Sequence, residues 1–507
     1  GAARAPEHAV LDRTAGAVDN GARPTTAEEL VTLIDPAVRR ADARFLLPSA
    51  PRTARVLGPD RGWAGALALA GIDLAPDEVT ADLVVASAES QREAVASGAP
   101  MLLVEGPARR GPLRAAGYQV ARYLVLPDVD HPELLVPVDG AHPRRYALRR
   151  RVAGAGRRRR AVVGVGAWAA ATAPTAVRPA SLLTVAARQA GLPFPLAAAG
   201  PLGVPRDVEW YLLLGTSHEL AERRMAFLAF PAGHRLPSWA VKVARVPGLE
   251  DAFAADERGL RQLEAAAPRR IDHAPKVLGR TEVAGLALSV ETAAVGDRLT
   301  EVLRVGGRSR VPLVDAIADW LVGLGVDSQQ RRPPAVDAAW LARVASTVGG
   351  HLDPAALLRT LDRCPSVLAH GDLGTWNVVA GDGGFTVIDW ESARPDGAPL
   401  TDLLHLLVDA CAQMERRARP ADRADYVRAL LRGDAELSPV VFEHVRRAAH
   451  QLQLPPEAAG ALATLTWLQR ADLVGRRSSG QEASPAAQVA RAWLTDPELG
   501  TSWPALG

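Results

Sequence analysis

The sequence is short of cysteine, with only Cys364 and Cys411 in 507 residues. Two cysteines do not make a disulfide framework, and their spacing does not match a zinc site. No secretory signal is recognisable in the first residues. These absences favour a reducing, cytoplasmic compartment. An apolar run of the roughly 20 residues that a membrane-spanning helix needs is also lacking.

Lysine and asparagine are nearly missing as well. Of the 59 basic residues only Lys242 and Lys276 are lysines, and Asn20 and Asn377 are the two asparagines. In a chain that uses arginine almost everywhere, a retained lysine or asparagine hints at a chemical requirement. With 48% hydrophobic and 23% charged residues the chain can bury a large core, and its length suits two or three domains.

Residues 26–140 alternate short apolar runs with helical patterns. The runs ARFLLP, TARVLG, ADLVVAS and PMLLVEG predict strands, and the run over 118–138 closes the sheet with period-two alternation that is typical of an antiparallel edge. This alternation predicts a small α/β Rossmann-like domain with a mostly parallel sheet. The order resembles a class I methyltransferase, but Gly58, Gly62 and Gly65 fit the glycine-rich cofactor turn poorly. A degenerate domain used for packing or partner binding is therefore favoured over a working cofactor site.

Residues 141–190 form a basic and apolar linker. Nine arginines lie between Arg144 and Arg160, and 17 uncharged residues follow. The favoured interpretation is a solvated basic helix and a buried joining element. The alternative is contact of residues 141–178 with an anionic membrane surface, peripheral to the inner face. Nucleic acid is not expected, because aromatic residues are sparse here.

Residues 191–507 predict an α+β, protein kinase-like domain. Three antiparallel strands, one helix and two more strands form a small β-rich lobe over residues 191–293. The remainder, 294–507, is a large helical lobe interrupted only at 365–395.

The interruption holds the chemical motif, VLAHGDLGTWNVVAGDGGFTVIDWE. A loop supplies Asp372 and Asn377, and a glycine turn leads to a strand that ends at Asp389. A hairpin would bring Asn377 and Asp389 to one end of a cleft. Phosphoryl transfer needs this set: a carboxylate that orients the attacking hydroxyl, and oxygen ligands for Mg²⁺.

These residues resemble the aminoglycoside phosphotransferase and choline kinase-like family, over about residues 195–507. The resemblance implies that Asp372 is the catalytic base, that Asn377 and Asp389 hold Mg²⁺, and that ATP is the cofactor. It also implies that His370 braces the loop and that Asp402 holds it. Glu391 and Asp396 are candidate substrate contacts, although Glu391 could equally cap the loop.

The small lobe supplies the phosphate-binding candidates. Lys242, in WAVKVAR, suits the α- and β-phosphates and a helix carboxylate, for which Glu257 is chosen over Glu250 and Glu264. The backbone of Glu291, Thr292 and Ala293 is expected to meet adenine. The phosphate cover between the first strands is weak, and its candidates are Gly215, Thr216 and Ser217.

The sequence thus predicts a kinase that transfers the γ-phosphate of ATP to a hydroxyl of a small molecule such as a sugar, amino alcohol or glycoconjugate. A dense acidic patch for a polycationic aminoglycoside is not evident. The alternative is a non-catalytic scaffold built from a pseudokinase and a pseudo-methyltransferase.

Overall fold

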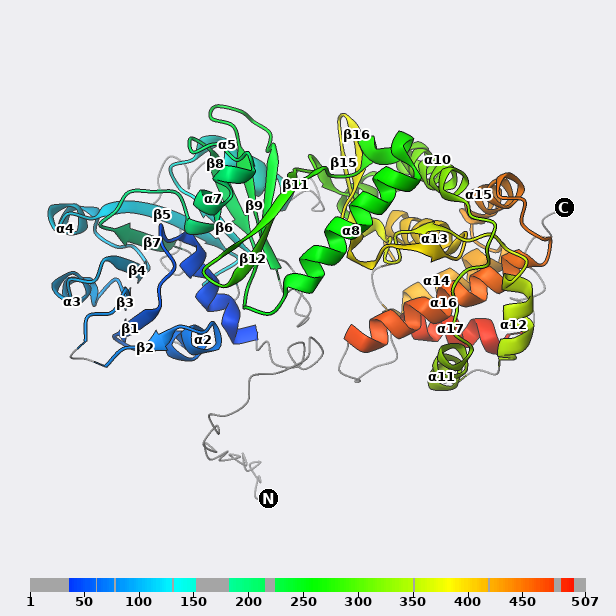
Figure 1. Cartoon of the computed structure of the whole chain (residues 1–507), viewed down its shortest axis with the longest axis horizontal. Coiled ribbons are helices and arrows are strands. Elements are labelled where there is room, and N and C mark those ends of the chain that lie inside the picture. The colour runs from blue at the N-terminus through cyan, green and yellow to red at the C-terminus, as the bar shows by residue number, and fades with distance from the viewer. Residues whose placement is uncertain are drawn as a thin grey trace, which may run out of the picture.

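The computed structural model describes residues 36–60, 62–76, 79–129, 132–151, 182–214, 224–349, 352–417, 420–477 and 485–496. Figure 1 shows a sheet-rich half, which contains the N-terminal strands, and a helical half. The long helix α8 (Glu250–Ala266) runs between the two halves.

Four N-terminal strands pair in parallel in the order β2-β1-β3-β4. They are β1 (Thr53–Leu57), β2 (Asp73–Leu74), β3 (Leu83–Ser87) and β4 (Met101–Glu105), with helices α2 (Trp63–Leu69), α3 (Gln91–Ala96) and α4 (Arg110–Ala115). Strand β3 is buried on both faces, since Leu83 and Val85 enter one core cluster and Val84 another. Such continuous apolar runs are typical of parallel strands covered on both sides. The expected strand–helix alternation is present, whereas the likeness to methyltransferases stays a prediction.

The N-terminal sheet and the small-lobe sheet are continuous, which differs from the separate domains expected at 26–140 and 191–507. Next come β5 (Gln119–Leu126) and β6 (Leu134–Pro137), and Leu134 of β6 pairs with Leu213 of β8 (Glu209–Leu213). One sheet of 12 strands results. Pairing between β6 and β8 satisfies two strand edges that separate domains would leave open.

The expected linker at 141–190 also contributes a strand to this sheet. Strand β7 (Leu182–Ala187) lies between β4 and β5 and is antiparallel to both. Residues 152–181, which include four of the nine arginines of the basic segment, lie outside the described residues. Before them, helix α5 (Ala141–Arg151) packs on the sheet through Tyr146, whose hydroxyl accepts a hydrogen bond from the backbone N–H of Gly296 at 3.1 Å.

The small lobe has the five strands and the helix that the sequence predicts. Its strand order is β11-β12-β10-β9-β8, with β9 (Arg224–Phe230), β10 (Trp239–Ala244), β11 (Val277–Val283) and β12 (Leu286–Thr292). Short helices α7 (Phe194–Ala198), η4 (Gly200–Leu202) and η5 (Pro268–His273) complete it. Every pairing among these strands is antiparallel.

The large lobe is helical, as predicted. Its helices are α9 (Leu299–Gly306), η6 (Gly307–Arg310), α10 (Val311–Ser328), α11 (Ala338–Val348), α12 (Pro354–Leu361), α13 (Thr401–Met414), α14 (Pro420–Arg432), α15 (Ser438–Gln451), α16 (Ala458–Arg477) and α17 (Pro485–Thr495). Short strands interrupt them: β13 (Asp297–Arg298), β14 (Val367–Ala369), β15 (Val378–Gly381), β16 (Gly384–Val387) and β17 (Arg394–Gly397). Within the described part of the chain, no helix has the length and apolar character that a membrane crossing requires.

The run ARFLLP, expected to be a strand, is not one: its first four residues end the 3-10 helix η1 (Pro36–Leu46), and Leu47 and Pro48 follow it. Asp42 and Arg44 of this helix are buried, whereas a half-exposed strand would turn such polar residues to solvent. Asp42 is fully buried and accepts a hydrogen bond from Nε of Arg245 at 2.8 Å, and Arg245 follows strand β10. The pair ties the N-terminal segment to the small lobe.

We expect Asp42→Ala to lower the free energy of unfolding by about 3–5 kcal/mol, because it leaves the Arg245 guanidinium buried without its carboxylate. Urea denaturation followed by circular dichroism measures the change. The control is Asp139→Ala, which removes an exposed pair with Arg110 and should cost no more than about 1 kcal/mol. Equal losses in the two variants would contradict a stabilising role for the buried pair.

Candidate active site

Hydrogen bonds of the buried His370 side chain hold the loop after β14 in place. His370 is fully buried; its Nδ1 accepts the backbone N–H of Asp372 at 3.4 Å, and its Nε2 lies 3.0 Å from the carbonyl oxygen of Ile388. Gly371 has φ of +83°, and a Cβ there would collide with the carbonyl oxygen of Ser392. Only glycine fits this position, so the residue before Asp372 is dictated by the backbone.

Side chains on one face of helix α13 accept hydrogen bonds from this loop. The carboxylate of Asp402 accepts the N–H groups of His370 at 2.6 Å and of Gly371 at 3.1 Å, which is the contact predicted for it. Asp409, two turns later, accepts both the N–H and the hydroxyl of Thr375 at 2.9 and 2.6 Å. Because both contacts use carboxylate oxygens, and Asp409 is also buried, they fix the loop strongly.

Between these two, His405 supports the loop as a neutral residue. Its Nδ1 lies 2.6 Å from the carbonyl oxygen of Leu373. Burial, with the nearby Arg470 as a second cause, lowers the pKa of His405 to about 3. The imidazole is therefore uncharged at neutral pH and donates its proton to the loop carbonyl.

The predicted hairpin is present and aligns the two candidate metal ligands. Strands β15 and β16 are antiparallel, and the N–H of Ile388 donates to the carbonyl of Asn377 at 2.9 Å. Asn377 lies in the short helix η7 (Thr375–Asn377), and its amide nitrogen donates to the carbonyl of Asp372 at 2.9 Å. Asp389 follows Ile388 with φ of +71° and begins η8 (Trp390–Ser392).

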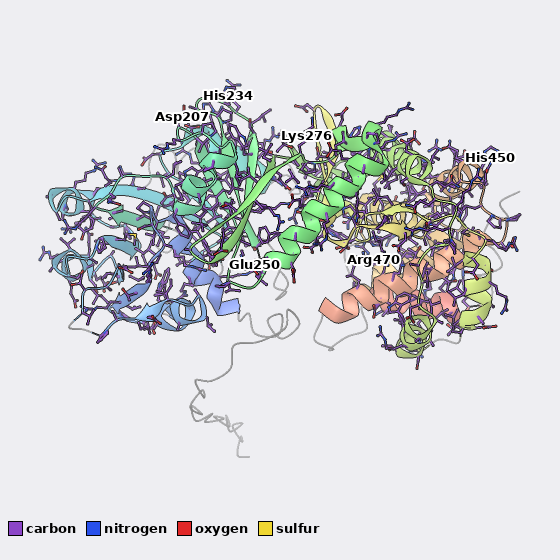
Figure 2. All side chains as sticks on the ribbon, viewed as in Figure 1. Asp207, His234, Glu250, Lys276, His450 and Arg470 are labelled. Carbon is purple, nitrogen blue, oxygen red and sulfur yellow. The ribbon has the colours of Figure 1, made fainter. Side chains whose placement is uncertain are left out.

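Lys242 lies in β10 and pairs with a carboxylate of α8, but that carboxylate is Asp256 rather than Glu257. The Nζ–Oδ2 distance is 2.6 Å. Glu257 faces another direction and forms ion pairs with Arg261 and Arg280. Asp256, one residue before Glu257 on α8, is the position that faces the sheet. Lys276, the other lysine, is exposed at the start of β11, as Figure 2 shows.

Asp256 connects the small lobe to the loop that contains Asp389 and Trp390. Its Oδ1 accepts the backbone N–H of Trp390 at 2.8 Å, directly after Asp389. This contact needs α8 close to η8, and a Cβ at Gly259 would collide with the carbonyl oxygen of Trp390. Although burial alone would raise it, the pKa of Asp256 falls to about 2, because Lys242 and Arg224 stabilise the carboxylate.

Arg224, which the sequence analysis missed, lies in β9 and joins the same cluster. Its guanidinium pairs with Asp389, lies 3.4 Å from Glu391 and 3.5 Å from Asp256. Lys242 also contacts Glu291 at 2.8 Å. Among the described residues, two cations thus face four carboxylates, and the formal charge of this set is −2. Glu391 contacts this cluster, whereas Asp396 lies in β17, which pairs with β14.

Two of the backbone N–H groups expected to contact adenine already donate hydrogen bonds within the protein. Thr292 donates its N–H to the carbonyl of Lys276, and Ala293 donates its N–H to the carbonyl of Ser238, both at 3.0 Å. Neither N–H is available to a base. Glu291 lies in β12, and burial raises the pKa of its side chain. The phosphate-cover candidates Gly215, Thr216 and Ser217 lie outside the described residues.

Asp372 itself is paired with a second arginine that the sequence analysis missed. Arg470, in α16, donates from Nη1 to Asp372 Oδ1 at 2.6 Å, and both side chains are less than one-tenth exposed. Figure 2 labels Arg470 on this helix, in the large lobe. Its guanidinium also lies over the ring of Trp376, 5.4 Å from the ring centre.

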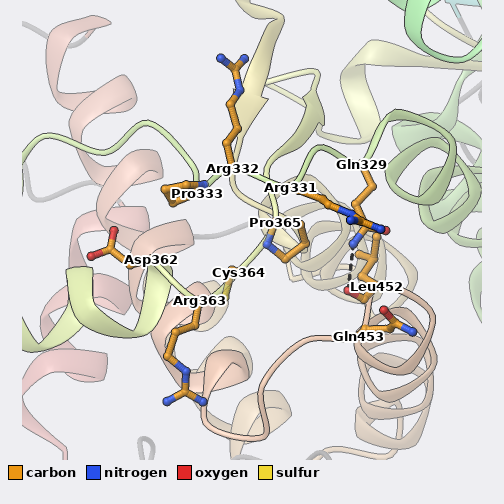
Figure 3. Close-up of a pocket in the computed structure, with 10 residues that line it drawn as sticks. All are labelled: Gln329, Arg331, Arg332, Pro333, Asp362, Arg363, Cys364, Pro365, Leu452 and Gln453. Carbon is orange, nitrogen blue, oxygen red and sulfur yellow. Dashed lines mark hydrogen bonds between the residues drawn. The ribbon is translucent and has the colours of Figure 1, made fainter.

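The pocket in Figure 3 lies elsewhere on the large lobe. It has a volume of about 230 Å³ and is lined by residues that include Arg331, Arg332, Arg363 and Cys364. None of the residues assigned to phosphoryl transfer lines it. In the described ranges, no group of three or more His, Cys, Asp or Glu side chains is arranged to hold a metal by itself.

The residues that were missed share a weak sequence signal. Arg224 and Arg470 are two arginines among many, and nothing in their neighbourhood marks them. His405 and Asp409, which were also missed, are different, because they lie on one helix face with the predicted Asp402, three and four residues apart, in an otherwise apolar stretch. Polar residues at helical spacing within a buried helix indicate a supporting contact.

No protein-family model matches the chain, and no curated protein matches it. Solved structures that resemble it include aminoglycoside phosphotransferase APH(4)-Ia in complex with ADP and hygromycin B, at 17% identity and a TM-score of 0.30 over 56% of this chain and 98% of that one. APH(3'')-Id from Streptomyces rimosus has 16% identity and a TM-score of 0.31 over 54% of this chain and 94% of that one. At this low similarity, function must be argued from the site residues themselves.

We expect Asp256→Asn to weaken ATP binding by about 10- to 100-fold, because it removes the charge that holds Lys242 and Arg224 in place. Calorimetric titration with MgATP measures the affinity. The matched control is Glu257→Gln on the same helix, which should change the dissociation constant by less than about twofold. If Glu257→Gln were the more damaging change, the pairing described above would be incorrect.

Proposed function

We propose that this chain is an ATP- and Mg²⁺-dependent phosphotransferase that transfers the γ-phosphate to a hydroxyl of a small molecule. The observation that carries the proposal is the linked set of Lys242, Asp256 and Asp389, together with Asp372 on a braced loop. Binding of phosphates by a strand lysine and placement of an acid beside the acceptor are the two requirements of this reaction. The acceptor class includes sugars, amino alcohols and glycoconjugates.

In this mechanism Asp372 orients the acceptor hydroxyl and accepts its proton as the oxygen attacks the γ-phosphorus. The bond from that phosphorus to the β-phosphate oxygen breaks, and ADP leaves. General-base assistance of this kind contributes about 10²- to 10⁴-fold. Lys242 neutralises phosphate charge, and burial makes its contribution larger than in water. The pKa of Lys242 is raised, because Asp256 and Glu291 outweigh its burial, so it stays protonated.

The residues present fit Mg²⁺. A carboxylate and an amide oxygen, from Asp389 and Asn377, are hard oxygen donors, and Mg²⁺ in phosphotransferases usually takes one or two protein ligands and phosphate oxygens. The cluster has a formal charge of −2, and Arg224 already places a positive group against Asp389. Bound there, the metal would neutralise the phosphates, and Asn377 and Asp389 would hold it.

One feature favours the non-catalytic scaffold as a second candidate. Both carboxylates that the reaction uses, Asp372 and Asp389, are paired with arginines, Arg470 and Arg224. A chain that had lost activity could keep such pairs for stability alone. Catalysis requires that ATP and the acceptor replace at least part of these contacts, whereas a scaffold would keep them.

Asp372→Asn separates the two candidates. We expect it to lower acceptor-dependent ATP turnover by about 10²- to 10⁴-fold, while the affinity for MgATP changes little. A coupled assay for ADP measures turnover, and calorimetry measures binding. Equal, slow turnover by wild type and variant with every hydroxylated acceptor tested would support the scaffold and overturn the kinase proposal.

A further inference from the structure

Arg470 is a buried cation beside Asp372, where the proposed function places the acceptor hydroxyl. This region is called the acceptor end of the site. Arg470 is 7% exposed, and two contacts fix its guanidinium: Asp372 at one nitrogen and the Trp376 ring against its face. A guanidinium carries five N–H donors, and within the described chain Asp372 is its one hydrogen-bonding partner. The contacts of the described residues therefore use one of its five N–H donors, and the others can bind a ligand.

The charged groups around Arg470 leave its guanidinium able to attract an anionic ligand. Asp372 neutralises one arginine, but Asp372 must also bind the acceptor hydroxyl. His405 is neutral at pH 7, since its pKa is about 3. Asp409 is bound by Thr375 and Arg423. Counted over the described residues, the acceptor end is therefore balanced rather than acidic, which is unfavourable for a polycation.

The position of Arg470 determines which chemical group the acceptor carries near its reacting hydroxyl. A hydroxyl that hydrogen-bonds to Asp372 lies beside Arg470, because the two side chains are 2.6 Å apart. A carboxylate or phosphate two or three bonds from that hydroxyl reaches the remaining N–H donors, which match two oxygens in parallel. An ammonium at the same place would meet the guanidinium and be repelled.

We propose that Arg470 is a specificity residue that binds an oxyanion of the acceptor, so that the substrate is a hydroxylated carboxylate or phosphate. This rests on the proposed kinase function and narrows its acceptor class. The reaction is balanced: the acceptor hydroxyl gives its proton to Asp372, its oxygen takes the γ-phosphoryl group, and ADP departs with the electrons of the broken bond. When the anion binds Arg470, it also releases Asp372 for the hydroxyl.

The test uses the full-length chain with MgATP and matched acceptors. The carboxylates are glycerate and gluconate, the phosphate is glycerol 3-phosphate, and the comparison compounds are glycerol, glucose, ethanolamine and glucosamine. We expect kcat/KM to be at least about tenfold higher for the anionic members. The carboxylate and phosphate arms show which oxyanion the site takes.

Variants assign the preference to Arg470. Arg470→Gln should lower kcat/KM for the anionic acceptors by about 10- to 100-fold, the loss expected for a charged hydrogen bond, and raise their KM. Arg470→Lys keeps the positive charge and should retain part of the preference for anionic acceptors. Retention of that preference would show that the loss in Arg470→Gln is not caused by misfolding. The control is Arg446→Gln, which removes an exposed helix arginine paired with Glu443 and should leave the preference unchanged.

Each outcome decides the proposal. Asp372-dependent turnover that favours neutral or amino acceptors overturns the inference and leaves the kinase function standing. A uniform loss of kcat in Arg470→Gln, for neutral and anionic acceptors alike, assigns Arg470 to the transferred phosphoryl group and also overturns it. If no acceptor is phosphorylated although ATP is hydrolysed, calorimetry decides: binding of the anions that depends on Arg470 supports the inference, and absence of binding overturns it. No ATP turnover at all overturns the kinase function and this inference with it.

Discussion

The site depends on the two carboxylate oxygens of Asp256. One oxygen accepts the Trp390 backbone N–H, and the other pairs with Lys242 in the small lobe. A single buried residue thus sets the distance between strand β10, which carries Lys242, and the loop that carries Asp389, which come from opposite lobes. The close approach of α8 at Gly259 makes this contact possible. Because a buried carboxylate with one partner removed is costly, the three groups hold their positions together.

The second constraint is that every charged group needed for chemistry is already paired inside the protein. Lys242 has two carboxylates, Asp389 has Arg224, and Asp372 has Arg470. These pairs lower the cost of burying charge before ligands arrive. Under the proposed function, a ligand would have to bring phosphates and a cation to one side, and an oxyanion with a hydroxyl to the other.

The sequence predicts the local elements well because their signals are local. The strands around Lys242, the hairpin between Asn377 and Asp389, and the helical large lobe follow from periodicity and glycine placement. The continuous sheet does not, since β6 and β8 are joined by edge pairing between distant segments. Asp256 was mistaken for Glu257 because adjacent helix positions differ by 100° in direction, and pattern alone fixes that angle poorly. Arg224 and Arg470 approach the site from 165 and 98 residues away in the sequence, so no local pattern reveals them.

We expect Asn377 and Asp389 to share a metal ion with ATP, which requires Arg224 to leave Asp389. A crystal structure with Mn²⁺ and a non-hydrolysable ATP analogue would test this, because manganese is located by its anomalous signal. The expected result is a manganese peak bound by oxygens of Asn377, Asp389 and the phosphates, with the Arg224 guanidinium moved away from Asp389. Nucleotide bound without metal, with Arg224 still paired with Asp389, would show that this assignment is wrong.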